Sequence, residues 1–459
     1  MWERRTRKRG RAARSAREQR FTVRGGSGDG GRVRLSPHDL LTGPVYTPRV
    51  FFYRRPLDGA ALRAALERTL ARYPIAAGRL RKDPDGGYSV HCTDAGVHFV
   101  EVHRAEPLPE HGPDSRAGAG LKRYLHQPNP FSVVDGDAPL LAVQLTRLAD
   151  GGSVLGVALN HTLADGTSML AFLESWSHEL RGLPVADPLH DRTLLEQLGT
   201  AAPAAARAAN EHYTVAGRLQ HLALLGRLIT RAGKLATVTV RFEPAELAAL
   251  KDTAMADLAG TGRWVSTHDA LAAQLWRVLA ELRARPERSV ESLGVTADLR
   301  ARAGGAVPAA YWGNAACYTY LTRPAAELAA APLGSVAEAV RGAGDQLTAE
   351  RLCADAAFLD AQRAAGRSHR VTNRLALGAY RDDGWLALNN RSRLPFYRMD
   401  FGAGRPFWVE YPEVPFPWTV DIMPTPGEDG GRDVHLSLPH DQAAALRTAG
   451  WQRRLRCFA

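Results

Sequence analysis

The sequence predicts an α/β (α+β) protein built as two similar halves, and three observations support this fold class. The chain has 459 residues, and at roughly 100 to 200 residues per domain this length suits two or three domains with large buried cores. From about residue 35 onward, short β-rich runs alternate with helical patterns. The order of strand and helix over residues 50–72 is repeated over residues 237–250. We therefore expect two α/β halves that a long crossover connects.

The first half should begin with a strand and a helix. Residues 50–53 are aromatic or β-branched, as is typical of a strand. Asp58 can cap a helix that ends before Tyr73 and Pro74. The apolar face of this helix is formed by Leu62, Leu66 and Leu70.

A hairpin and another helix should complete the first half. Two β-rich runs, residues 140–148 and 153–160, flank a short Ala-Asp-Gly-Gly turn, and this arrangement predicts a β-hairpin. We expect a helix to follow from about Gly166 to Arg181, because Gly182 can end it. Its apolar stripe consists of Met169, Phe172, Leu173 and Trp176.

The second half should start after a connector. Residues 183–235 open with prolines, become rich in alanine and end in an expected helix near residues 216–232. Residues 237–242 predict a strand, and Pro244 opens a helix. Ser266 begins another helix, in which the negative charge of Asp269 is stabilised by the positive end of the helix dipole. The expected organisation is an N-terminal domain over residues 35–190, a crossover linker and helix over 191–235, and a C-terminal domain over 236–459.

Positive charge is concentrated at the start of the chain. The net charge is +11, and residues 1–34 hold twelve basic residues against three acidic ones. We expect these residues to be a disordered extension, because they contain few large apolar side chains and end in a glycine-rich run. A non-specific anion-binding tail, a targeting segment and a functionless extension all fit this composition. The rest of the chain is nearly neutral, which argues against nucleic-acid binding.

Other features of the composition suggest where the protein works. Its four cysteines are scattered without a CxxC pair, so the sequence predicts neither a disulfide framework nor a zinc site. No stretch approaches 18 consecutive apolar residues, so we expect no transmembrane helix. We expect a cytoplasmic monomer, and the bias towards Arg, Ala and Gly suggests a GC-rich bacterial genome.

One segment carries candidate catalytic residues. His161 stands at the end of a buried-looking strand, and Asp165 stands at the start of the next helix. A histidine titrates near neutral pH and can act as a general base. An aspartate this close to it could orient the imidazole ring or brace the turn. By itself this pattern also fits a structural histidine beside a helix-capping aspartate. No second cluster stands at ligand spacing, so we predict no metal site.

A second motif, near the C-terminus, helps to interpret the segment that contains His161 and Asp165. The pairing of His-x-x-x-Asp-Gly with a late Asp-Phe-Gly-x-Gly-x-Pro resembles the BAHD acyltransferases, an acyl-CoA-dependent family of specialised metabolism. Similar landmarks occur in the same order between about residues 33 and 445. They are residues 35–39, 51–53, 73–74, 77–80, 191–192, 270–277, 298–300 and 311–314.

The resemblance implies a chloramphenicol-acetyltransferase-like fold of two domains with a channel between them. Acyl-CoA would enter as co-substrate from one face and a small-molecule alcohol or amine from the other, without a permanently bound cofactor. His161 would be the general base, and Asp165, Gly166 and Arg300 would support its turn, with an ion pair between Asp165 and Arg300. The late motif would form a structural loop outside the reaction centre. Its residues are Asp400, Phe401, Gly402 and Gly404.

The sequence departs from the family pattern at two places. Ala403 stands where the family usually has Trp, and residues 389–391 stand where many members have a Thr-Ser-Trp-like run. Asn389 could donate a hydrogen bond to negative charge that develops in the transition state. Arg391 could recognise a carboxylate or phosphate on the substrate, or it could face the phosphates of CoA.

Two alternatives remain open at this point. Carrier-protein-dependent acyltransferases and condensation domains share the fold and take their acyl group from a phosphopantetheine arm. They commonly have two consecutive histidines, whereas Asn160 precedes His161 here. The other alternative is a binding or regulatory protein that has kept the fold without activity. The presence of both His161 and Asp165 argues against it.

Overall fold

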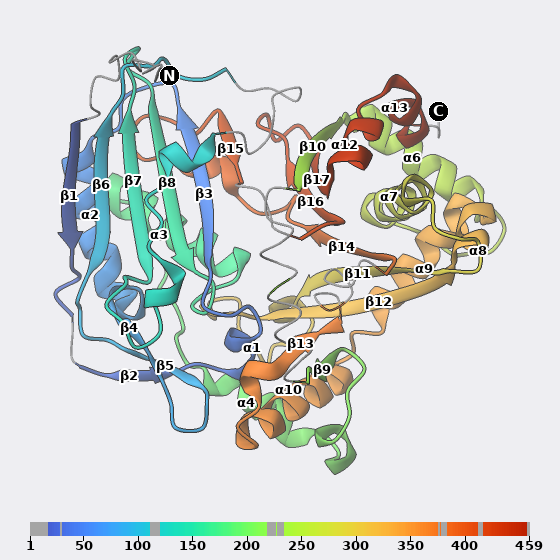
Figure 1. Ribbon diagram of the computed structural model, residues 1–459, viewed down its shortest axis with the longest axis horizontal. Helices are drawn as coiled ribbons and strands as arrows, with labels where there is room; N and C mark the ends of the chain where they lie inside the picture. The colour runs from blue at the N-terminus through green and yellow to red at the C-terminus, as the bar shows by residue number, and fades with distance from the viewer. Residues whose placement is uncertain are drawn as a thin grey trace, which may run out of the picture.

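The computed structural model describes residues 17–27, 30–110, 120–217, 234–374, 383–411 and 416–456, together with Gly226 and Leu377. Two large six-stranded sheets lie side by side, the first on the left and the second on the right of Figure 1, and helices pack against both. The α/β architecture with two halves that the sequence predicts is confirmed.

The first sheet is built mainly from the N-terminal half of the chain. Its neighbouring strands are antiparallel, except for the parallel pair β6 and β7. In spatial order its strands are β1 (Arg17–Val23), β6 (Val97–His103), β7 (Leu141–Arg147), β8 (Ser153–Asn160), β3 (Tyr46–Tyr53) and β15 (Trp408–Glu410).

The second sheet is built from the C-terminal half. Three neighbouring strands, β16, β14 and β11, run parallel, and the other neighbours are antiparallel. In spatial order its strands are β10 (Leu235–Phe242), β17 (Arg432–Pro439), β16 (Thr419–Pro424), β14 (Trp385–Asn390), β11 (Val290–Asp298) and β12 (Ala316–Pro324). Two small sheets join β2 (Arg32–Arg34), β5 (Tyr88–His91) and β4 (Arg79–Lys82), and β13 (Val371–Asn373) with β9 (Tyr213–Val215).

Helices link and cover these sheets. The α-helices are α1 (Pro37–Leu40), α2 (Gly59–Arg72), α3 (Gly166–Arg181), α4 (Thr193–Leu198), α6 (Pro244–Ala256), α7 (Thr267–Arg283), α8 (Ala325–Ala330), α9 (Leu333–Asp345), α10 (Ala349–Ala364), α12 (His440–Leu446) and α13 (Ala449–Leu455). Short 3₁₀-helices span Pro74–Ala77, Leu121–Tyr124, Pro130–Ser132, Gly199–Ala201, Ala204–Arg207, Leu299–Ala301, Ser368–Arg370 and Phe396–Arg398.

Local signals in the sequence set several of these boundaries. The Asp58 side chain accepts hydrogen bonds from the first backbone amides of α2. Helix α3 starts at Gly166 and ends at Arg181, where Gly182 adopts a left-handed conformation with φ of 67°. Strands β7 and β8 form the predicted hairpin. The expected strand near residue 237 and the helices after Pro244 and Ser266 are also confirmed.

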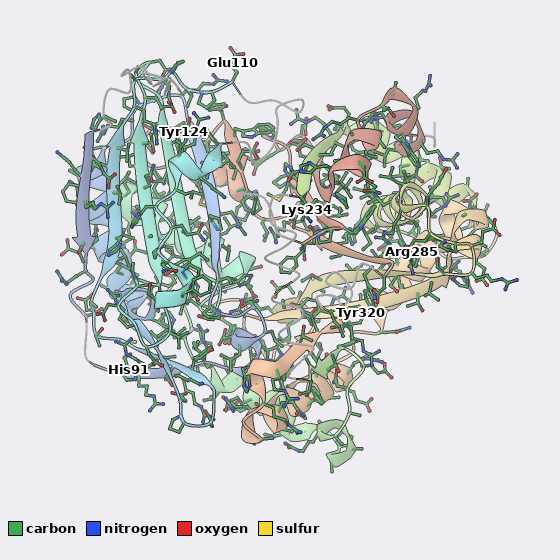
Figure 2. The ribbon with its side chains drawn as sticks, viewed as in Figure 1. His91, Glu110, Tyr124, Lys234, Arg285 and Tyr320 are labelled. Atoms are coloured by element: carbon green, nitrogen blue, oxygen red, sulfur yellow. The ribbon has the colours of Figure 1, made fainter. Side chains whose placement is uncertain are left out.

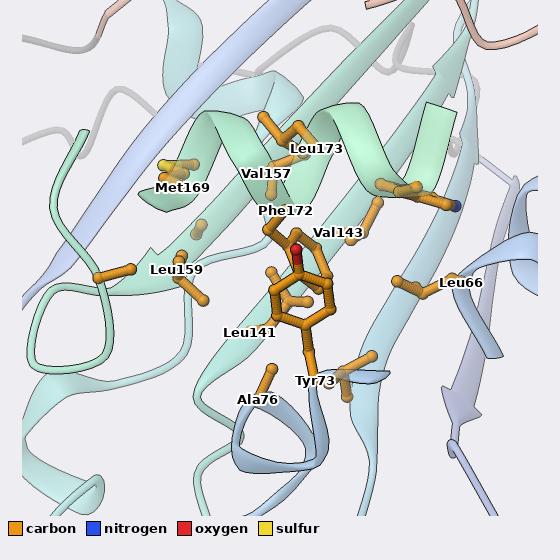
Figure 3. Packing of buried hydrophobic residues seen from close by; sticks show 14 of the residues in the cluster. Leu66, Tyr73, Ala76, Leu141, Val143, Val157, Leu159, Met169, Phe172 and Leu173 are labelled. Atoms are coloured by element: carbon orange, nitrogen blue, oxygen red, sulfur yellow. The ribbon is translucent and has the colours of Figure 1, made fainter. Parts of the chain in front are cut away.

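The first core lies between the first sheet and the helices α2 and α3. Tyr73 and Phe172 meet edge to face at its centre, with ring centroids 5.1 Å apart (Figure 3). Trp312, which comes from the second half of the chain, packs against Tyr73 in the same core, and its indole nitrogen donates to the Ser168 carbonyl at 2.7 Å. Each fully buried aromatic side chain contributes roughly 1.5 to 3 kcal/mol to stability. The two halves therefore share this core.

The opposite face of the first sheet carries a smaller cluster. Tyr124 lies over this face in Figure 2 and meets Phe52 edge to face, with ring centroids 5.8 Å apart. The second sheet has its own core, in which the leucines of α7 pack with Trp276 and the apolar residues of β14, β16 and β17.

Part of the N-terminal segment is folded. The prediction that residues 1–34 are disordered is wrong for β1 and β2, while residues 1–16 lie outside the described residues. Strand β1 pairs with β6 through backbone hydrogen bonds, which need no apolar composition, and the Asp94 carboxylate accepts from the amides of Gly25 and Gly26. The helix expected near residues 216–232 lies outside the described residues, apart from Ala216, Gly217 and Gly226.

One strand crosses the predicted domain boundary. The sequence places residues 408–410 in the C-terminal domain, but they form β15, which pairs with β3 of the first sheet. The loop before β15 also packs on the first half, because Phe401 contacts the rings of Tyr53 and Trp176. Strand pairing between segments so distant in the chain leaves no local pattern in the sequence.

Removing β1 should destabilise the protein. A truncated chain that begins at residue 24 loses the strand that covers the edge of β6, together with the buried Val23 and the contact between Phe21 and Arg63. We expect the free energy of unfolding to fall by about 3 to 5 kcal/mol. A chain that begins at residue 17 is the control and should keep its melting temperature. Equal melting temperatures for the two truncations would contradict the assignment.

Candidate active site

The turn after β8 presents His161 at the end of a buried strand. All eight residues of β8 are buried, and the backbone amide of His161 donates to the Val45 carbonyl at 2.7 Å. The Asn160 side chain accepts from the amide and the hydroxyl of Thr162, at 3.2 and 2.7 Å, which closes the turn. The strand end and the turn together fix the backbone on both sides of the histidine.

The surroundings of the His161 ring favour its neutral form. Burial lowers its pKa below the ordinary value of 6.5, and the residue's own backbone carbonyl and Asp165 oppose this shift. The guanidinium groups of Arg49 and Arg391 lower the pKa further. The Nδ1 atom is buried and makes no hydrogen bond to any other described residue. A neutral imidazole can accept a proton, and Nε2 is the nitrogen that remains to do so.

Asp165 joins the turn to the second half of the chain. One carboxylate oxygen caps α3 by accepting from the Ser168 amide at 2.9 Å. The other accepts from the Ala315 amide at 2.8 Å and pairs with Arg300 at 2.9 Å. The side chains of Arg300 and Asp165 are 5% and 12% exposed, so this ion pair is largely buried. Arg300 also donates to the Gly313 carbonyl and the Ser168 hydroxyl, at 2.9 and 2.7 Å.

A second buried ion pair lies on the other side of the same segment. Asp39 of α1 pairs with Arg192 at 3.2 Å, and both side chains are almost fully buried. Asp39 accepts from the amide and the side chain of Asn314, at 3.0 and 2.9 Å. The Asn314 side chain then donates to the His161 carbonyl at 2.8 Å. The carbonyl of His161 is thus held through Asn314 by a charged residue far away in the chain.

A row of polar side chains lies on the face of the second sheet that points away from the core of that sheet. Asn389 pairs in register with Asp421, and Asp421 pairs with His435, so their side chains lie side by side on one face. On the other face, Leu388 and Val420 belong to the buried core. The Asn389 side chain is partly buried and makes no hydrogen bond to a described residue. Its amide is therefore free to donate to a substrate.

Two arginines extend this polar row towards His161. Arg391 follows β14 and lies 3.3 Å from the Asp421 carboxylate. Arg49 belongs to β3 of the first sheet, where it pairs in register with Val157 of the strand that leads to His161. Both guanidinium groups stack on the ring of Tyr411, at 3.9 Å for Arg49 and 5.3 Å for Arg391. The two sheets meet at this tyrosine.

The late motif forms a tight loop on the rear of α3. The Asp400 carboxylate accepts from the amides of Gly402 and Gly404, at 2.9 and 3.0 Å. Both glycines have positive φ values, 88° and 87°, which other residues rarely adopt. The Asp400 carbonyl accepts from the Ser177 hydroxyl at 2.7 Å, and Phe401 packs on Trp176. The loop holds the C-terminal part of α3, far along the helix from the turn at Asp165.

The predicted site residues thus fall into distinct groups. Asp165 and Arg300 form the expected ion pair. Gly166 is the first residue of α3, but a methyl group there would come no closer than 3.8 Å to Leu394, so sterics do not demand glycine. Sequence reasoning assigned no role to Asp39, Asn314 and Arg192, and it missed a further set of residues around Arg391. That set consists of Arg49, Tyr411, Asp421 and His435, and no local motif identifies its members.

Some kinds of site are absent from the described part of the chain. No three His, Cys, Asp or Glu side chains gather there in a way that could hold a metal ion. No helix among the described residues is long and apolar enough to cross a membrane. A cavity of about 550 Å³ lies between α4, α10 and Arg34, and its lining does not include His161.

Comparisons with known proteins place the whole chain in a family. A model of the Transferase family matches residues 27–450. The chain is 29% identical over 440 residues to a hydroxycinnamoyl-CoA:5-hydroxyanthranilate N-hydroxycinnamoyltransferase (HHT4) of Avena sativa, covering 91% of this chain and 94% of the relative. It is 30% identical over 453 residues to putrescine hydroxycinnamoyltransferase 1 of Oryza sativa subsp. japonica, covering 93% and 96%.

A solved structure shows the same fold. TRI101 of F. graminearum, complexed with coenzyme A and T-2 mycotoxin, superposes with a TM-score of 0.72 at 19% identity, covering 92% of this chain and 98% of that chain. Fold and site together define an acyltransferase with a chloramphenicol-acetyltransferase-like fold. The chain belongs to the Transferase family, the family of the BAHD acyltransferases, and uses acyl-CoA as its co-substrate.

Loss of the Arg300 side chain should damage both stability and activity. Arg300→Gln leaves the Asp165 carboxylate buried without its charged partner, which typically costs about 3 to 5 kcal/mol. We expect a lower melting temperature and a fall of about tenfold or more in kcat/KM, because the turn that carries His161 loosens. Arg302→Gln changes an exposed arginine two residues away and is the matched control. An Arg300→Gln protein that melts with the wild type would show that the pair does not brace the turn.

Proposed function

We propose that this enzyme transfers an aromatic acyl group from CoA to an amine or hydroxyl group of a small metabolite, with His161 as general base. The observation that carries the proposal is a neutral, partly buried histidine whose backbone is held by two buried ion-pair networks. The acyl class follows the relatives reported above, whose names specify hydroxycinnamoyl transfer, to 5-hydroxyanthranilate in one case and to putrescine in the other. The name of the first relative specifies a CoA thioester, which favours free acyl-CoA over a carrier-bound donor.

In the proposed mechanism, Nε2 of His161 accepts the proton of the acceptor group as that group attacks the thioester carbonyl. Burial of Nδ1 supports this assignment, because a substrate cannot reach that atom. The tetrahedral intermediate carries a negative oxygen, to which the Asn389 amide would donate a hydrogen bond. Collapse of the intermediate breaks the carbon–sulfur bond and expels CoA thiolate, which takes the proton back from His161. No covalent acyl-enzyme forms.

We propose structural roles for the other predicted residues. Asp165 and Arg300 would keep the turn in place, and the loop of Asp400, Phe401, Gly402 and Gly404 would position α3 behind it. We also propose that the N-terminal domain, crossover and C-terminal domain divide near residues 190 and 235, with residues 396–411 as an excursion onto the first half.

Three further predictions concern the protein as a whole. We propose a monomer in the cytoplasm. The free cysteines Cys92, Cys317 and Cys353 are consistent with a reducing compartment, and Cys457 lies outside the described residues. A bacterial source is a prediction that rests on the bias towards Arg, Ala and Gly. The relatives reported above come from plants.

Replacement of His161 tests the mechanism. We expect His161→Ala to lower kcat for benzoyl-CoA by about 10² to 10⁴, because a general base typically contributes that factor. Release of free CoA thiol in the presence of an amine acceptor measures the rate. The melting temperature should change little, since the ring makes no side-chain hydrogen bond that braces the fold. Transfer at the wild-type rate would rule out His161 as the base.

The pH dependence of the reaction should report the His161 pKa. Because burial and two nearby arginines lower this pKa, the base stays neutral at neutral pH and becomes protonated only below 6.5. We therefore expect kcat/KM to be constant around pH 7 and to fall on the acid side of pH 6.5. Arg391→Gln removes one of the positive charges and should move this acid limb to higher pH. A limb above pH 6.5 in the wild type would contradict the proposed environment.

A further inference from the structure

Arg49 and Arg391 form an unusual pair of buried cations. Arg49 is 6% exposed, and Arg391 is about three-quarters buried, with 24% of its side chain exposed. They come from different sheets and share the ring of Tyr411. Arginine side chains are rarely buried unless their charge is compensated, so a pair of them needs an explanation.

Described carboxylates near the pair compensate only part of its charge. Asp421 lies 3.3 Å from Arg391, yet its Oδ1 atom makes no hydrogen bond, so the planar fork of the guanidinium is not engaged by it. Among the described residues, no carboxylate lies within 4.0 Å of Arg49, which donates a hydrogen bond to the neighbouring Pro48 carbonyl at 2.7 Å. Two cations therefore face one carboxylate.

The remaining side chains around the pair are neutral near pH 7. Burial raises the pKa of Tyr411, although both arginines oppose the shift. Burial lowers the pKa of His435 and of His161. Burial also lowers the pKa of Arg49 to about 10, which leaves it charged. This group of residues therefore carries a net positive charge of one unit.

The pair lies close enough to His161 for both charges to act on its ring. Arg49 is on the strand paired with β8, and both arginines act on the charge of His161. When the thioester carbonyl of an acyl-CoA lies at His161, the full length of the pantetheine arm separates the CoA phosphates from His161. An anion bound by Arg49 and Arg391 must therefore belong to the acceptor or to the acyl group.

We propose that Arg49 and Arg391 bind a carboxylate carried by one of the two substrates, next to the bond that is made. This proposal rests on the proposed acyl transfer at His161. A carboxylate can accept two parallel hydrogen bonds from one guanidinium and a charge-assisted bond from the other. It would complete the charge balance of the buried group. The same charges oppose a polyamine acceptor such as putrescine, so they select between acceptor classes.

Binding can be measured without turnover. Benzoate and its neutral isostere benzamide serve as probes in calorimetric titrations of the full-length protein. We expect the wild type to prefer benzoate, and we expect Arg49→Gln and Arg391→Gln each to reduce that preference by about 10- to 100-fold. The matched controls are Arg54→Gln, at an exposed arginine directly after β3, and Arg398→Gln, at an exposed arginine seven residues after Arg391, and both should keep the preference.

Kinetic arms then identify which substrate carries the carboxylate. The first compares 5-hydroxyanthranilate with its methyl ester as acceptors of benzoyl-CoA. The second compares malonyl-CoA with acetyl-CoA as donors to the methyl ester. A preference for the charged member that both arginine variants reduce assigns the carboxylate to the acceptor in the first arm and to the acyl group in the second. Each ratio is taken within one variant, so a partly unfolded preparation does not change it.

Several outcomes would overturn the proposal. A wild type without preference for any charged member would do so, as would variants that retain the preference. An equal rise in KM for every CoA ester in both variants would instead assign the arginines to CoA itself. The outcome for the proposed function is separate. If the enzyme acylates the methyl ester but shows no preference for a carboxylate, the proposed acyl transfer stands and the carboxylate site is wrong. If benzoate binding depends on the arginines but no CoA thiol is released, the carboxylate site stands and the proposed acyl transfer is wrong.

Discussion

The Asp165 carboxylate is the group on which the geometry of the active site most depends. It caps α3 through the Ser168 amide, accepts from the Ala315 amide and pairs with Arg300. The start of the helix, the turn after β8 and a segment of the second half are therefore fixed by one side chain. A buried carboxylate is costly unless donors surround it, and here each oxygen has at least one. His161 is held in place because its turn cannot shift without breaking this group.

The segment 311–315 is held from both sides by the same kind of interaction. Asp165 and Arg300 hold Gly313 and Ala315, while Asp39 holds Asn314 and pairs with Arg192. Between them, Trp312 enters the first core and packs on Tyr73. Buried ion pairs are weak sources of stability, but a mispaired arrangement would leave a charge uncompensated. These pairs thus specify how the two halves meet, and the aromatic contacts stabilise the result.

The proposed reaction centre draws on both sheets, because each supplies a different property. The first sheet ends in the histidine and contributes Arg49, whereas the second presents Asn389, Asp421 and Arg391 on its polar face. Burial and the nearby guanidinium groups both favour the neutral form of His161, so the environment that would bind an anion also keeps the proposed base ready to accept a proton. Positioning, charge and basicity are coupled through Tyr411, where the two sheets meet.

The sequence by itself determined the local elements and placed His161 and Asp165 on the turn between β8 and α3. Asp58, Gly182 and the apolar stripes fixed the bounds of α2 and α3, because caps and periodicity act within a few residues. The partner of Asp165 became visible only through a family resemblance, since Arg300 is distant in the chain. The prediction of disorder from composition is wrong for β1, because the pairing of this strand depends on backbone hydrogen bonds.

Tertiary structure decided which distant residues meet. The placement of β15 in the first sheet, the bond from Asn314 to the His161 carbonyl and the stacking of two arginines on Tyr411 join segments separated by more than a hundred residues. Such contacts arise from the packing of completed sheets and helices, so no short pattern records them. Charge balance around a histidine is a property of that packing. It exists only after the two halves have come together.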